Sequence, residues 1–217
     1  MRYKFLFKIV TFSLLLFSGL TSSATHLLGG YMNYEFLNID PTSGNYRYKI
    51  TFHVYRDCSG KVELDDQITL GVYLNDNNKS LNQQPTFKLV AKQRVQPPGS
   101  IECDFYRKNV CIEYGLYEGI ISLKPYSEGY HITYTRCCRN VQNNIVQDGA
   151  MPSQGQTYYC YIPSTALQNS SPAFYGVPSP YMCVNDTNSF LFDAVDRDGD
   201  SLVYRFMRPY QGGSPAS

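Results

Sequence analysis

The chain has 217 residues, a formal net charge of +1 and only 17% charged residues, with no run of lysine or arginine. A nucleic-acid partner requires a basic face, so the composition excludes that class of function. Tyrosine (20 residues) and phenylalanine (12) are abundant and tryptophan is absent, and aromatic residues suit strands better than helices. We therefore predict an all-β protein.

The N-terminus has the three parts of a secretory signal peptide. Arg2, Lys4 and Lys8 are followed by an apolar stretch at 9–20 and then by small residues at 21–24. The alternative is a membrane anchor, but the apolar stretch is shorter than the roughly 20 residues that a spanning helix needs. We expect residues 1–24 to be removed after Ala24, no membrane-spanning segment in the mature chain, and a location outside the cytoplasm.

Strand patterns dominate the chain up to about residue 165. From Tyr46 to Val54 apolar and polar residues alternate strictly, which is typical of a half-buried strand in an antiparallel sheet. Similar but shorter patterns predict strands at 32–36, 68–74, 87–91, 110–114, 116–123, 130–134 and 157–162. Short strands separated by turn signals indicate a β-sandwich. We assign residues 25–165 to one disulfide-braced, Ig-like β-sandwich domain.

A second unit is expected at 166–217. Two apolar segments, 190–192 and 202–204, flank the turn Asp196–Asp200 and are predicted to form a hairpin. Two strands cannot bury a core alone. The segment is therefore interpreted as the start of a second Ig-like or cadherin-like module, either in a longer protein or completed by another chain.

The chain has seven cysteines, and after a signal peptide disulfides are the expected chemistry. Zinc is disfavoured because no CxxC pair is present. Cys103 and Cys111 flank a polar loop, and we expect a bridge between them. Cys137 and Cys138 are adjacent and point to opposite sides of an extended strand, so they need different partners. Cys58 is a candidate partner for one of them. Because seven is odd, one thiol is free or pairs outside the chain.

The strongest candidate for a metal site is an acidic run. Asp193, Asp196, Asp198 and Asp200 alternate around a glycine turn, and carboxylates in such a pattern can gather oxygen ligands for Ca²⁺. The competing interpretation is a solvated hairpin turn, in which aspartate and glycine are favoured anyway. The turn is the preferred interpretation, and no other cofactor is expected.

No catalytic motif of the common hydrolase, metalloprotease or nucleotide-binding types occurs in the sequence. His53 and His131 each lie on the polar side of a strand pattern, where a surface role is favoured over catalysis. Exposed tyrosines could form a carbohydrate- or protein-binding surface. The alternation around Tyr46 and Tyr130 favours instead an inward, core position for most of them. We predict that the chain is not an enzyme.

Five segments of the chain form a recognisable set, and the most specific of them are "YRDCS" at 55–59 and "RCCRN" at 136–140. The five ranges are 24–30, 48–59, 130–140, 169–174 and 196–204. In this order they resemble the N-terminal region of large Bacteroidetes surface proteins. Those proteins often carry PKD or cadherin-like repeats and a gliding-motility-associated C-terminal sorting domain for type IX secretion.

The resemblance implies a secreted, cell-surface protein associated with the outer membrane and exported by the type IX secretion machinery. Cysteines of the family pattern are replaced by Gln168 and Met207, and Cys160 is additional. The resemblance therefore implies a rewired bridge between Cys160 and Cys183. Cys58 and Cys138 are also expected to be bridged, with Cys58 a candidate partner for one of the two adjacent cysteines. The expected function is a structural or adhesive module with an extracellular glycan or protein ligand. The alternative is a glycan-binding accessory module of a secreted enzyme.

Overall fold

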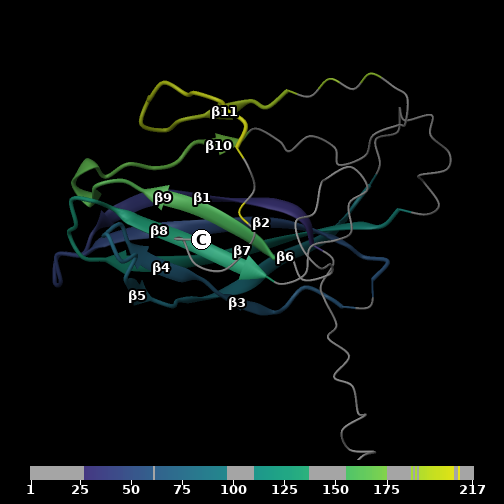
Figure 1. Cartoon of the computed structure of the whole chain (residues 1–217), viewed down its shortest axis with the longest axis horizontal. Helices are drawn as coiled ribbons and strands as arrows, with labels where there is room; N and C mark the ends of the chain where they lie inside the picture. The colour runs from purple at the N-terminus through teal and green to yellow at the C-terminus, as the bar shows by residue number, and fades with distance from the viewer. Residues whose placement is uncertain are drawn as a thin grey trace, which may run out of the picture.

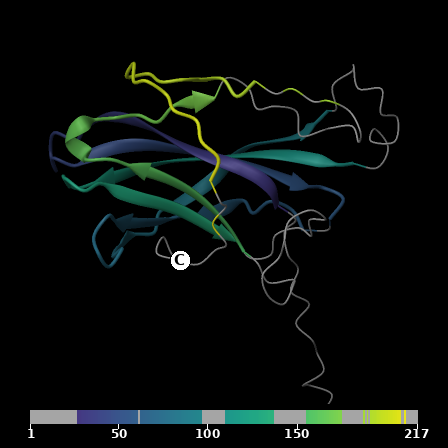
Figure 2. The same ribbon diagram turned by 45° about the horizontal axis from the view of Figure 1, so that its top comes forward.

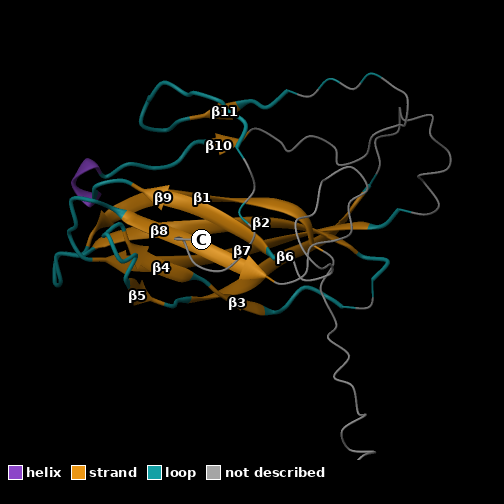
Figure 3. Ribbon diagram, in the orientation of Figure 1, coloured by secondary structure: helices purple, strands orange, loops and turns teal. Residues whose placement is uncertain are grey.

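The computed structural model describes residues 27–60, 62–96, 110–136, 155–174, 187, 189, 191–207 and 210. They form an all-β structure in which two antiparallel sheets pack face to face, as Figure 1 and Figure 3 show. The five-stranded sheet has the order β1 (Leu27–Ile39), β2 (Tyr46–Asp57), β7 (Ile112–Leu123), β6 (Thr86–Val95), β3 (Gln67–Thr69). The four-stranded sheet has the order β5 (Leu81–Gln83), β4 (Gly71–Leu74), β8 (Tyr130–Arg136), β9 (Gln156–Ile162). The predicted β-sandwich is confirmed.

Strand β2 lies at the centre of the core and follows its predicted alternation. Tyr48, Ile50, Phe52 and Val54 are buried, whereas the residues between them are partly exposed. The ring of Phe52 reaches across the sandwich to two tyrosines of the four-stranded sheet, with the closer centroid, that of Tyr158, at 4.8 Å. Burying each large apolar side chain contributes about 1.5–3 kcal/mol, so this strand holds the two sheets together.

Two strand boundaries differ from the prediction. The expected strand 68–74 divides at Leu70, a fully buried residue between β3 and β4, where the chain passes from one sheet to the other. The expected strands 110–114 and 116–123 form the single strand β7. Gly115 and Gly119 interrupt its apolar pattern because a Cβ there would meet Leu64 and the Phe87 ring, each at 2.4 Å.

The pairing of β2 with β7 also decides the disulfide. Asp57 lies opposite Ile112, so Cys58 and Cys111 become neighbours and form a bridge across 53 residues. The predicted Cys103–Cys111 bridge and the pairing of Cys58 with Cys138 are therefore wrong, because strand register overrides nearness in sequence. Cys160 has a free, buried thiol on β9 instead of the expected bridge to Cys183. Cys103, Cys137, Cys138 and Cys183 lie outside the described residues.

After β9 a short 3-10 helix, η1 (Thr165–Leu167), leads into a segment that lies along the edge of the sandwich. We call the described residues 169–174, 191–207 and 210 the arm. Its strands β10 (Ala173–Phe174) and β11 (Ala194–Val195) pair with each other above β1 and β9 (Figure 1). The predicted hairpin is wrong in its described part, since Leu191–Phe192 and Leu202–Tyr204 are not strands. Phe190 lies outside the described residues.

The chain after residue 168 lies along the sandwich because β1 is an edge strand. The open backbone groups of an edge strand require a partner, and Ser171 supplies one. The Ser171 N–H donates to the Tyr34 carbonyl at 2.8 Å, and the Ser171 hydroxyl oxygen accepts from the Tyr34 N–H at 2.8 Å. The arm then crosses the edge toward the four-stranded sheet (Figure 2), where the rings of Tyr210 and Tyr159 lie 5.5 Å apart. Within the described part of the chain, no helix is long and apolar enough to cross a bilayer.

Candidate binding surface

The outer face of the five-stranded sheet has an aromatic cluster, which consists of Tyr31, His53, Tyr55 and Tyr114. The alternation of β1, β2 and β7 turns these side chains away from the core, and the register places Tyr31 beside His53 and Tyr55 beside Tyr114. The ring of Tyr31 stacks on that of His53 with centroids 4.2 Å apart. The rings of Tyr55 and Tyr114 lie 5.4 Å apart. Four residues from three strands thus form one continuous aromatic surface.

The aromatic cluster is uncharged at neutral pH. Burial lowers the pKa of His53 to about 4, against a smaller opposing effect of Glu118. Burial likewise raises the pKa of Tyr31, and it raises the pKa of Tyr114 to about 12. Nδ1 of the neutral imidazole and the Tyr114 hydroxyl share a hydrogen bond of 2.8 Å. All four side chains remain partly exposed, so the surface offers ring faces and hydroxyls to a ligand.

The four-stranded sheet has a different group on its outer face, which we call the histidine network. His131 Nδ1 lies 2.7 Å from the Tyr159 hydroxyl, and its Nε2 lies 2.8 Å from Asn75 Oδ1. Lys79 Nζ donates to the same Asn75 oxygen. Burial lowers the pKa of His131, and the nearby positive charge of Lys79 lowers it further. Its polar atoms bond one another, so this network ties a loop to the sheet and offers less to a ligand than the aromatic cluster.

The four aspartates that were predicted as calcium ligands do not gather. Among the described residues, which include all four, no group of three or more acidic, histidine or cysteine side chains could hold a metal ion. Asp196 Oδ1 accepts the N–H groups of Asp198 and Asp200, which closes the turn. Asp198 Oδ2 accepts the Ser170 N–H at 2.6 Å. The carboxylates hold the arm in shape, so the turn interpretation agrees with the structure and the calcium hypothesis does not.

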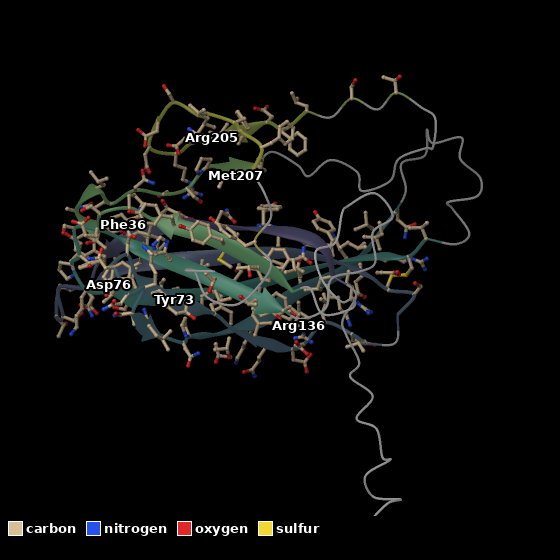
Figure 4. All side chains as sticks on the ribbon, in the orientation of Figure 1. Phe36, Tyr73, Asp76, Arg136, Arg205 and Met207 are labelled. Carbon is tan, nitrogen blue, oxygen red and sulfur yellow. A yellow bond between two sulfur atoms is a disulfide. The ribbon has the colours of Figure 1, made fainter. Side chains whose placement is uncertain are left out.

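Arg56 and Arg136, one from each of the two most specific sequence segments, lie at one end of the core. Arg56 is the last inward residue of β2 and is 4% exposed; its Nε contacts Glu113 Oε2 at 2.6 Å. Arg136 is the last residue of β8, pairs with Asp65, and is labelled in Figure 4. Arg56 Nη1 also donates to the Val62 carbonyl. The two arginines therefore hold the segment 62–65 across the end of the sandwich.

A cavity of about 10 Å³ lies between this segment and the core, lined by Asp65, Tyr134 and Arg136 among others. It is about the size that one water molecule occupies, so it is too small for an organic ligand. The alternation of β2 extends to Arg56 and could have indicated the buried arginine. Its partner Glu113 depended on the register of β7. Arg56 and Arg136 are thus assigned a structural role at this end of the fold.

Comparison of the chain with protein-family models, with curated proteins and with solved structures finds no match.

Proposed function

We propose that this chain is an exported structural and adhesive module of a larger bacterial surface protein, and that it binds without catalysis. The observation that carries the proposal is the aromatic cluster on the outer face of the five-stranded sheet. The export pattern of residues 1–24, the Cys58–Cys111 bridge and the resemblance to Bacteroidetes surface proteins support the location.

The aromatic cluster has the properties of a binding surface. Tyrosine supplies a large contact area with a polar tip and loses little conformational entropy on binding. His53 fits this role because its pKa keeps it neutral and its Nδ1 is engaged by Tyr114. The ligand is expected to lie flat against the rings, since none of the four lines the cavity at the end of the sandwich or the larger hollow beside Phe174.

A second candidate function is glycan binding in the service of a secreted enzyme. The specific observation in its favour is that the partly exposed rings of Tyr31 and Tyr55 are neutral and carry hydroxyls. Such rings can stack on the apolar face of a neutral sugar and bond its hydroxyl groups. A glycan array probed with the purified chain separates this candidate from a protein ligand, and no signal on the array would count against it.

The location is tested by protease treatment of intact cells, with a periplasmic protein as the control. We expect the chain to be cleaved while the periplasmic protein stays intact. Cleavage of the chain only after the cells are lysed would overturn the proposed location.

The binding surface is tested with beads that carry the purified chain, scored for attachment to intact cells and to a panel of neutral polysaccharides. Tyr55→Ala should weaken attachment at least about tenfold, as for a residue that anchors an interface. Tyr161→Ala, which removes an exposed ring from the opposite sheet, is the matched control. Equal losses for both variants, or no loss for Tyr55→Ala, would refute the assignment.

A further inference from the structure

The arm exposes an unusual amount of apolar surface for so short a segment. Phe206 is as exposed as in an extended peptide, at 107%, and Leu191 and Val203 are each 78% exposed. Figure 4 shows Met207 and Arg205 on the same part of the arm, beyond the edge of the sandwich. The exposed apolar side chains are those of Phe174, Leu191, Phe192, Val195, Val203, Tyr204, Phe206 and Met207.

The arm also has a hollow beside these side chains. Its volume is about 450 Å³, and it is lined by Phe174, Phe192, Tyr204, Arg205 and Phe206. Four of these five residues are aromatic, and the fifth is a guanidinium that can stack on an incoming ring. A hollow of this size accepts one or two large apolar side chains. The arm thus has both protruding apolar residues and a place that could receive them.

We propose that this apolar face of the arm is the interface of a homodimer, in which each arm packs against the arm of a second copy. A surface that has both protruding side chains and a hollow that can receive them is self-complementary, as a two-fold interface requires. Protruding side chains such as Leu191 and Val203 of one copy enter the hollow of the other, and Arg205 lies against the partner's rings.

The exposed apolar area of the arm is large enough for a dimer interface. A large aromatic side chain has a surface of about 150–250 Å². Multiplied by the exposed fractions of the eight residues, this gives an exposed area on the order of 1,000 Å². A stable interface buries about 800 Å² on each partner, whereas exposed apolar patches on monomers seldom exceed a few hundred Å². Strands β10 and β11 contribute only two residues each, so the arm cannot cover this surface by itself.

The dimer is independent of the proposed function, because the arm and the aromatic cluster are separate surfaces. They meet where the rings of Phe174 and Tyr31 pack edge-on, and neither variant of the test below changes these two residues. A dimer through the arms would place two aromatic clusters on one particle and would raise the avidity of attachment to a repetitive surface. Loss of dimerisation would therefore lower bead attachment without changing the binding of a single chain.

The test is analytical ultracentrifugation of the chain purified from the periplasm of an expression host, over a range of concentrations. We expect a reversible monomer–dimer equilibrium. The double variant Phe192→Ser and Phe206→Ser should raise the dissociation constant on the order of 100-fold, the loss expected when two anchoring rings are removed. Ile120→Ser, which removes an apolar residue that is 53% exposed on the five-stranded sheet, should leave it unchanged.

Three results would overturn the proposal. One is a wild-type chain that stays monomeric at the highest concentration. Another is a dimer that the double variant does not weaken or that Ile120→Ser weakens equally. The third is a dimer that persists on a denaturing gel without reductant, because it would be held by a disulfide. Far-UV circular dichroism of each variant shows that the β-sandwich has formed, so a loss of dimer reports on the interface.

Discussion

The buried ion pair between Arg56 and Glu113 allows a quantitative test of how the end of the sandwich is built. Their side chains are 5% and 15% exposed, and the Nε to Oε2 distance is 2.6 Å. Removing one partner leaves the other charge buried and unpaired, which costs about 3–5 kcal/mol. Arg56→Met and Glu113→Leu should each lower the free energy of unfolding by that amount. Against a typical total of about 5–15 kcal/mol, either variant should lose about a fifth of the stability or more.

The double variant should be far more stable than the sum of the single effects predicts. Replacing both charges by apolar groups relieves their desolvation, and such replacements are often neutral or stabilising. The remaining loss is the hydrogen bond from Arg56 to the Val62 carbonyl, about 1 kcal/mol. The expected coupling energy is therefore about 3 kcal/mol or more.

Urea unfolding measures these values, followed by tyrosine fluorescence because the chain has no tryptophan. The matched control is the pair Lys49–Glu118 on the outer face, with side chains 37% and 31% exposed. Its coupling should be below about 1 kcal/mol and should fall with salt. Single variants of the buried pair that cost less than 1 kcal/mol and add without coupling would refute the reasoning.

Three further predictions concern stability. The pKa of His53 is lowered in the fold to about 4 from an ordinary value of 6.5. As the pH falls, the unfolded chain therefore takes up a proton at His53 before the fold does. The fold should lose about 1–2 kcal/mol between pH 7.5 and 5 from this group, after a discount for partial exposure. Urea titrations should find the loss smaller by that amount in His53→Gln, and the lowered pKa of His131 accounts for a part that remains. Replacing Cys58 and Cys111 together by serine should lower the unfolding free energy by up to about 4 kcal/mol, the loop entropy of 53 residues, whereas an unchanged denaturation midpoint would show that the bridge does not form. Tyr48→Phe should stabilise the fold by about 1 kcal/mol and so raise the melting temperature, because among the described residues the buried Tyr48 hydroxyl has no hydrogen-bond partner. A lower melting temperature would contradict this.

The parts of the fold that could be read from the sequence are those with a local signal. Strand β2 is the clearest case, because its period-two pattern specifies both the strand and its buried face. The prediction divided β7 in two at Gly115. A glycine is needed there because of the Leu64 side chain, which comes from a distant loop and therefore gives no local signal. The short strand β5 lies between the predicted strands 68–74 and 87–91, where no strand was predicted, and it exists only because β4 pairs with it.

The candidate site required the tertiary structure for the same reason. Each ring of the aromatic cluster has an unremarkable place in its own strand, and only the register of β1, β2 and β7 brings the four together. The serines after Gln168 lie in the segment that was assigned to a second unit, and their hydrogen bonds go to the edge of β1.

By itself, the sequence determined the fold class and the inward face of the main strands, because burial follows a pattern that repeats every second residue. Strand pairing decided the rest. The partner of Cys58 is Cys111, and the partner of Arg56 is Glu113, because β2 and β7 lie antiparallel with Asp57 opposite Ile112. Contacts between residues more than fifty positions apart depend on register, and register is settled when the two sheets bury a common core.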